Sequence, residues 1–240
     1  MIFYVLLGAV LAGAITGLVL VALQPGKPKP PAWSTWKPAQ GDTQAKIAEI
    51  ADHIASQYLL SKNGRQLVAI IPSKPEVTQY TNISKVSTIG ILASANSSSF
   101  SRIVSTSGAI QEQFCGLGTA CSIQQGTATA ARERLLRREA LEVALYTFKF
   151  VPSVNAVIAY MPPPPGQNPT TVLYLERSNL SQELSHPLKE TLPLTTPPLP
   201  TQSDSVESRT IDRLTVPVEY SFQYEGLSDG TKALVLAPAT

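Results

Sequence analysis

The pattern most suggestive of catalysis is Gly226-Leu227-Ser228-Asp229-Gly230, which matches the G-x-S-x-G elbow that presents a nucleophilic serine in many hydrolases. Such an elbow leads from a strand into a helix, and its acid and histidine partners follow it in the chain. Here only ten residues follow Gly230, they have the apolar character of a strand, and His53 and His186 come earlier. We therefore predict a hairpin turn at this segment and assign no catalytic residue.

Two shorter motifs also lack the context that their chemistry needs. Ser34 and Lys37 have the S-x-x-K spacing of penicillin-binding proteins, but they lie in a proline-rich segment where no pocket would hold a nucleophile. Gly116 and Gly118 lack the third glycine of a dinucleotide loop, and they fall between two predicted strands rather than before a helix. No cofactor-binding residue follows from either motif.

The two histidines and two cysteines do not have the spacing of a zinc site, which needs four nitrogen or sulfur ligands. We predict no metal ligands. Cys115 and Cys121 are instead expected to form a disulfide that staples the neck of a hairpin, because a short loop separates them. Free buried thiols are one alternative. A thiol redox switch is another, although a C-x-x-C motif is absent.

The charge pattern excludes nucleic acid as a partner, because a formal net charge of +2 supplies no strong field. The one dense basic cluster is formed by Arg132, Arg134, Arg137 and Arg138. Glu133 and Arg137, and likewise Arg138 and Glu142, have helical i,i+4 spacing, which predicts a solvated, partly self-paired helix face. A patch that binds phosphate or lipid headgroups is the alternative, because arginine suits phosphate.

The apolar run at residues 2–23 contains no charged side chain. As a helix it would be about 33 Å long, enough to cross a hydrocarbon core of about 30 Å. A cleaved signal peptide is the alternative, since Ala12-Gly13-Ala14 looks like a cleavage site. However, no basic region precedes the run, and the run continues well beyond Ala14. We therefore expect one transmembrane helix at residues 2–23 in contact with the lipid bilayer.

Within this helix, Ala9, Gly13 and Gly17 recur every four residues and place small side chains on one stripe. Such a stripe lets another helix approach closely, so these residues are candidates for packing against a partner helix. The alternative is that glycine is simply common in transmembrane helices.

The remaining chain predicts one α+β domain, a mixed sheet with two main helices packed on it. A proline-rich spacer at 24–41 contains Trp33 and Trp36, which would lie either at the lipid headgroups or against the domain. The domain itself is assigned to 42–190. One expected helix runs from about 43 to 58, and a longer one begins at Thr127 or Thr129 and ends at about 150. The expected strands lie at 66–72, 86–93, 102–106, 109–115, 155–161 and 170–175.

Two further segments complete the chain. Residues 191–208 are rich in proline, serine and threonine and are expected to form a linker or a long loop. Residues 209–240 are expected to form a C-terminal hairpin of the same domain, with Asp229-Gly230 in its turn.

The sequence therefore favours a membrane-anchored, non-catalytic envelope protein that binds or scaffolds another membrane or envelope component. The anchor, the stiff spacer and the exposed prolines all suit a domain that presents a surface. One alternative is a membrane-tethered enzyme with a dispersed site, built from carboxylates such as Glu139 and Glu142, for which the pattern offers no specific ground. A thiol redox switch is a further alternative.

The side of the membrane on which the domain lies depends on two opposing arguments. Lys27, Lys29 and Lys37 follow the helix, and the positive-inside rule would then keep the domain in the cytoplasm. The cysteine pair and the charged fraction of 15%, against about 25% in ordinary domains, suit an oxidising exterior instead. We expect an extracytoplasmic domain.

The anchor at residues 2–23 can be tested by fractionation. The full chain is expected to stay with membranes through an alkaline carbonate wash, because a continuous apolar helix is not released by high pH. A shortened chain that begins at Asp42 is expected to be soluble and folded. Recovery of a mature protein that lacks residues 1–14 or more would contradict the anchor.

Overall fold

The computed structural model describes residues 31–39, 41–62, 64–79, 82–124, 126–200 and 206–239. Trp33–Thr240 form one compact unit. The predicted membrane helix at 2–23, with Ala9, Gly13 and Gly17, lies outside the described residues. No helix in the described ranges has both the length and the apolar character needed to cross a bilayer.

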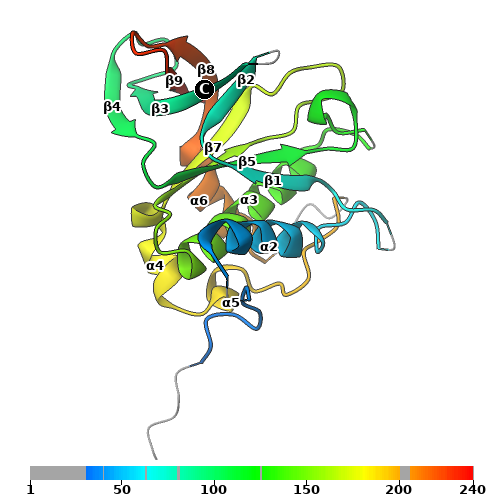
Figure 1. The fold of residues 1–240 in the computed structure, drawn as a ribbon. Coiled ribbons are helices and arrows are strands. Elements are labelled where there is room, and N and C mark those ends of the chain that lie inside the picture. Colours follow the sequence, from blue (N-terminus) through cyan, green and yellow to red (C-terminus); the bar gives the residue numbers. More distant parts are fainter. Residues whose placement is uncertain are drawn as a thin grey trace, which may run out of the picture. The chain divides into compact units, whose positions relative to one another are not determined.

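The unit combines helices with a mixed sheet, as predicted (Figure 1). The helices are α2 (Thr43–Ala55), α3 (Ala130–Phe150), α4 (Ser181–Ser185), α5 (Leu188–Thr191) and α6 (Ser208–Thr215), with short 3-10 helices η1 (Thr119–Cys121), η2 (Arg177–Leu180) and η3 (Val216–Val218). The strands are β1 (Ala69–Ser73), β2 (Glu76–Gln79), β3 (Asn82–Leu92), β4 (Phe100–Ser105), β5 (Ala109–Cys115), β6 (Ala156–Tyr160), β7 (Thr171–Glu176), β8 (Glu219–Gly226) and β9 (Lys232–Pro238).

The described strands form one nine-stranded sheet in the order β1-β5-β6-β7-β8-β9-β3-β2, with β4 paired to β3. Two pairs are parallel, β5 with β6 and β3 with β9, and the other pairs are antiparallel. The parallel pair β5 and β6 is joined through α3, because parallel neighbours need a crossover connection.

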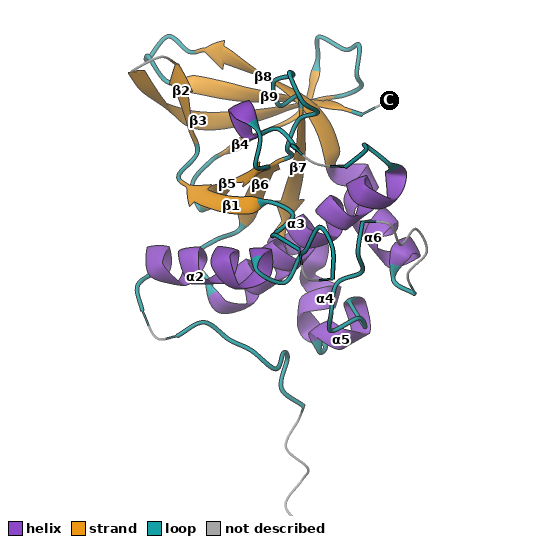
Figure 2. Ribbon diagram, turned by 90° about the vertical axis from the view of Figure 1, so that its right-hand side faces the viewer, coloured by secondary structure: helices purple, strands orange, loops and turns teal. Residues whose placement is uncertain are grey.

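The two long helices cover one face of the sheet (Figure 2). The Asp42 carboxylate caps α2 by accepting from Ala45 N at 2.8 Å, and Ile47, Ile50 and Ile54 then follow the 3.6-residue period into the core. The Thr129 hydroxyl caps α3 in the same way, accepting from Arg132 N. Most of α3 is buried on all sides, so it is the central helix of the unit.

The other face of the sheet has its own core, because the sheet curves until β3 and β9 pack over β5, β6 and β7. Ile89 of β3, Leu234 of β9 and Ile158 of β6 are all fully buried in this second core. Two tyrosine hydroxyl groups in this second core bind each other, because the Tyr224 hydroxyl donates a hydrogen bond to the Tyr160 hydroxyl at 2.7 Å. Because both faces of the sheet are covered here, consecutive residues of β6 and β7 are buried, instead of every second residue.

Trp33 and Trp36 pack against the helices rather than extending away from the unit. The Trp33 ring meets the Tyr146 ring edge to face, with 5.2 Å between centroids, and the Trp36 ring stacks on His53 at 3.7 Å. Leu188 N also donates to Trp33 O at 2.7 Å. The compact unit consequently begins at Trp33, earlier than the boundary at residue 42 that the sequence suggested.

The C-terminal part contains an unexpected helix before its hairpin. β8 and β9 pair antiparallel from Tyr220 with Pro238 to Gly226 with Lys232, in agreement with the predicted hairpin. Residues 208–215, however, form α6, whose short apolar face includes the buried Ile211. Eight residues present too few apolar positions for the 3.6-residue period to be evident in the sequence.

A buried ion network centred on Arg138 connects α3 to the rest of the helical layer. Its Nε donates to Glu207 Oε1 at 2.6 Å, its Nη1 to Glu142 Oε2 at 2.8 Å, and its Nη2 to the Leu194 carbonyl oxygen at 2.8 Å. The Tyr58 hydroxyl donates to the same Glu142 oxygen at 2.6 Å. The described part of 191–208 therefore crosses the surface of the unit as a long loop rather than hanging free.

Two carboxyl groups in the interior have no such partner. Glu112 alternates with Ile110 and Phe114 on β5 and is fully buried, and burial raises its pKa to about 8. Burial also raises the pKa of Glu139 on α3 well above its usual range. Neither carboxyl meets a hydrogen-bond partner among the described atoms. Glu112 is therefore mostly protonated and neutral at neutral pH, and burial favours the neutral form of Glu139 in the same way.

Replacing Glu112 with Gln is expected to flatten the pH dependence of stability. Because its pKa rises from an ordinary value of 4.5 to about 8 on folding, the folded chain retains a proton that the unfolded chain loses between these values. The free energy of unfolding of the native chain should then fall through this window, by about 1.4 kcal/mol per pH unit for this group. Its contribution is complete below pH 4.5 and lost as the pH rises through about 8.

Urea unfolding from pH 4 to 9 would measure this effect. Glu112→Gln should match the native chain at low pH and exceed its stability at high pH. Glu225→Gln is the matched control, since Glu225 is exposed on β8, and it should retain the native slope. Equal slopes in the native chain and Glu112→Gln would contradict the assignment.

Candidate functional site

The crossover from β5 through α3 to β6 forms an open edge where several chain segments converge. Both strands end at this edge because they are parallel, and α3 begins there. The connection from β5 to α3 is described at residues 116–124 and 126–129, and Met161-Pro162-Pro163-Pro164-Pro165 follow the end of β6. Crevices outside the carboxyl ends of strands are the usual ligand sites in open α/β sheets.

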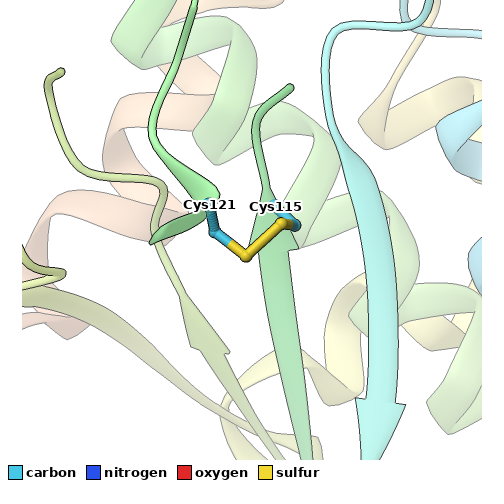
Figure 3. Close-up of a disulfide and its surroundings, with 2 residues drawn as sticks. All are labelled: Cys115 and Cys121. Atoms are coloured by element: carbon cyan, nitrogen blue, oxygen red, sulfur yellow. A yellow bond between two sulfur atoms is a disulfide. The ribbon is translucent and has the colours of Figure 1, made fainter. Parts of the chain in front are cut away.

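A disulfide holds the first half of the loop after β5. Cys115 at the end of β5 and Cys121 in η1 are bonded, with 4.2 Å between their Cα atoms (Figure 3). This confirms the predicted disulfide, and no free cysteine remains. The bond closes a tight turn that leads toward α3, where the neck of a hairpin was expected from the sequence.

The glycines of this turn serve its own folding. Gly116 N donates to Cys121 O, and Gly118 N donates to Ser122 O, both at 2.8 Å. A Cβ at Gly116 would lie 2.3 Å from Ser122 O, so only glycine permits this close approach. Helix α3 follows this loop, but the N–H groups of Gly116 and Gly118 are already bonded and do not form a phosphate-binding loop.

A cavity of about 480 Å³ lies at the edge where α3 begins. Its walls are the loop residues Ile123 and Gly126, the first two turns of α3, the segment from Met161 to Pro165, and the starts of β7 and β8. Pro163 O accepts from Ile123 N at 3.1 Å, which joins the proline wall to the loop after β5. The volume is within the range of small-molecule sites, about 300–1,000 Å³.

Arg137 organises the charges on one side of the cavity. Its Nη2 lies 2.7 Å from Asp212 Oδ1 on α6, and its Nη1 lies 3.5 Å from Glu219 Oε2 and 3.9 Å from Glu133 Oε1. Burial raises the pKa of Glu219, and Arg137 opposes part of this effect. The carboxylates of the lining, Glu133 and Glu219, therefore both face the same guanidinium.

Arg132 adds a second buried guanidinium to the lining. The residue is 4% exposed, and burial lowers its pKa. Gly126 has φ of +82°, and a Cβ there would lie 2.5 Å from Arg132 Nη1. A glycine at 126 thus leaves room for the guanidinium beside the loop.

The prediction of a solvated arginine face is wrong. Arg138 and Arg137 are 1% and 7% exposed, and Arg134 binds Asp212 with its Nε at 3.1 Å from Oδ1. The expected i,i+4 pairs do form, at 3.9 Å for Arg137 with Glu133 and 2.8 Å for Arg138 with Glu142. Acidic residues of the later segments α6, β8 and Glu207 cover the face, and periodicity within α3 could not reveal them.

The hydrolase-like motif is a turn, as expected. Leu227 N donates to Thr231 O and Gly230 N donates to Leu227 O, so residues 226–230 lead from β8 directly into β9. Ser34 donates to Trp36 O and lies with Lys37 outside the cavity lining. Glu139 and Glu142 are core residues, 0% and 8% exposed, and they do not line the cavity.

The two histidines have different neighbours. His53 stacks on Trp36, and its Nε2 is 3.0 Å from Gln57 Nε2, while His186 lies 3.8 Å from Glu190. Within the described ranges no cluster of three or more His, Cys, Asp or Glu side chains could hold a metal ion.

Sequence reasoning did not identify the cavity. Arg132 and Arg137 were recognised only as part of a basic cluster, and Glu219 and the prolines at 162–165 were not connected with them. One signal was present, namely four consecutive prolines directly after an aliphatic strand. Their meaning depends on the parallel pairing of β5 and β6, which places the start of α3 beside them.

Comparison of the chain with protein-family models, with curated proteins and with solved structures gives no match.

Proposed function

We propose that the chain is a membrane-anchored, non-catalytic envelope protein that binds or scaffolds another envelope component through this cavity. The observation that carries the proposal is the construction of the cavity, whose lining combines four consecutive prolines with Arg137, held by Asp212 and Glu219. Prolines and ion-paired side chains are rigid, and a preorganised surface loses little conformational entropy on binding.

The chemistry of the lining supports binding over catalysis. Among the described lining residues, threonines supply the hydroxyl groups, and no histidine, cysteine or lysine stands beside them as a base. Both carboxylates of the lining lie near the Arg137 guanidinium, at 3.9 Å for Glu133 and 3.5 Å for Glu219. These groups suit recognition of a ligand better than activation of a nucleophile.

The proposal includes a bilayer anchor at residues 2–23 and an extracytoplasmic location for the compact unit. The disulfide between Cys115 and Cys121 supports this location, because structural disulfides persist in oxidising compartments and are rare in the cytosol.

Binding through the cavity can be tested by photocrosslinking in native membranes. A photoreactive residue at Pro164, which is exposed and lines the cavity, is expected to capture one envelope component that mass spectrometry can identify. The same residue at Leu227, exposed in the β8–β9 turn, is the matched control and should not capture it. Equal capture from both positions, or none from Pro164, would refute the proposal.

The location can be tested by rapid alkylation of intact cells. Mass spectrometry before and after reduction should show Cys115 and Cys121 blocked as a disulfide in protein from native membranes, because the oxidising exterior maintains the bond. A membrane-impermeant protease should also digest the compact unit in intact cells or spheroplasts. Free thiols together with a protected unit would place it in the cytoplasm.

A further inference from the structure

We infer that Asn96 is an N-glycosylation site, and that its glycan shields the open edge of β4. The inference rests on the extracytoplasmic location in the proposed function, because N-linked glycans belong to the surface loops of exported chains. It follows from three features of the β3–β4 region: an acceptor triplet in an exposed loop, reactive groups that are not engaged there, and an unprotected strand edge beside the loop.

The loop between β3 and β4 carries Asn96-Ser97-Ser98, which matches the N-x-S/T triplet that accepts N-linked glycans. Ala93 N donates to Ser99 O at 2.9 Å and closes the base of the loop. Asn96 and Ser98, the two residues that define the triplet, are both exposed. The fold therefore presents the triplet at the surface.

The side chains that the transfer needs are not held by the protein. Ser97, between them, is engaged, since its Oγ accepts from Ser99 N at 2.9 Å and donates to Ser99 O at 3.2 Å. Within the described ranges no hydrogen bond holds the Asn96 carboxamide or the Ser98 hydroxyl. In the transfer, Asn96 Nδ2 bonds to the anomeric carbon of a glycan carried on a lipid diphosphate, and the released diphosphate takes the amide proton.

Three other asparagines begin similar triplets, and each is in a less suitable setting. Asn82-Ile83-Ser84 is paired with β2 within the sheet. Asn179-Leu180-Ser181 is helical, and Leu180 is 2% exposed. Asn168-Pro169-Thr170 has a proline at the central position, which the acceptor pattern excludes. Asn96 is therefore the acceptor that the folded chain offers in a loop.

Strand β4 has an open edge next to this loop (Figure 1). Among the described strands it pairs with β3 alone, and Phe100 and Ile103 are 43% and 63% exposed. Proline or lysine commonly protects such an edge, and β4 contains neither, whereas β1 at the end of the sheet contains Pro72. The single charge of β4, on Arg102, is paired with Glu176 at 2.5 Å.

A glycan on Asn96 would supply the missing protection. Asn96 precedes Phe100 by four residues, so the two are at most about 14 Å apart along the chain. An N-linked glycan is bulky and hydrophilic, and at this distance it would hinder another strand from pairing with β4. The acceptor triplet and the unprotected edge thus account for each other.

Mass spectrometry of the protein from its native membranes would test the site. Trypsin releases the peptide from Val86 to Arg102, in which Asn96 is the only asparagine. This peptide is expected to carry a glycan, and fragmentation that retains the glycan should assign it to Asn96.

Four variants, expressed in the source cells, connect the glycan to the triplet. Asn96→Gln and Ser98→Ala should lose it completely, because each removes one of the two residues that the acceptor pattern requires. Ser98→Thr restores the hydroxyl and should keep the glycan. Ser99→Ala is the matched control, since Ser99 is an exposed serine of the same loop outside the triplet.

Size-exclusion chromatography of the full chain in detergent would test the shielding. Asn96→Gln is expected to elute as larger assemblies than the native chain, because the edge of β4 can then pair with another copy. Adding Ile103→Lys to this variant should restore the native elution, because a charged residue on an edge strand opposes pairing. Circular dichroism would verify the fold of each variant.

An unmodified Asn96 in the native protein overturns the inference, as does a glycan that persists in Asn96→Gln or is lost equally from Ser99→Ala. Native elution of unglycosylated Asn96→Gln would overturn the shielding. An unmodified Asn96, found together with an intact disulfide and a unit open to external protease, would reject the glycan and leave the proposed location and function intact.

Discussion

The guanidinium of Arg138 is the interaction on which the helical layer depends. It is almost fully buried, and it joins α3 to Glu207 before α6, to the Leu194 carbonyl in the long loop, and to the Glu142 and Tyr58 pair. Removing one partner from a buried ion network leaves an uncompensated charge that costs roughly 3–5 kcal/mol. Segments distant in the sequence are therefore held together by one side chain.

The same helix positions both the core and the cavity. Arg138 points into the network that fixes α6 and the long loop, and Arg137, the preceding residue, binds Asp212 of α6 and faces Glu219 of β8. Because both arginines bind the α6 region, the contacts that fix Arg138 in the core also fix the position of Arg137 in the cavity lining. The prolines that line the cavity have a restricted backbone, and the Pro163 carbonyl oxygen accepts from Ile123 N.

The buried carboxyl groups are accommodated in the core in two different ways. Glu207 and Glu142 are ionic partners of Arg138, whereas Glu112 and Glu139 have no hydrogen-bond partner among the described atoms, and burial raises the pKa of both toward the neutral form. A paired charge confers geometric specificity, and a neutral carboxyl avoids most of the desolvation penalty. Lowering the pH therefore favours the folded state through Glu112 and Glu139.

Local patterns in the sequence were sufficient for the two long helices, for most strands and for the disulfide, but not for α6, and tertiary structure alone decided what surrounds these elements. The alternation over 109–115 corresponds to β5, the 3.6-residue period to α2 and α3, and the six-residue offset between Cys115 and Cys121 to a bond within one tight turn. The burial of the α3 arginines could not be read from the sequence, because their type and spacing would be the same on an exposed face. They are buried by contacts with Glu207, Asp212 and Glu219, which come about 70 to 80 residues later in the chain.

The cavity likewise depends on the parallel pairing of β5 with β6. A sequence determines helices and strands through short-range periodicity, whereas burial and sites arise from long-range contacts that periodicity does not encode.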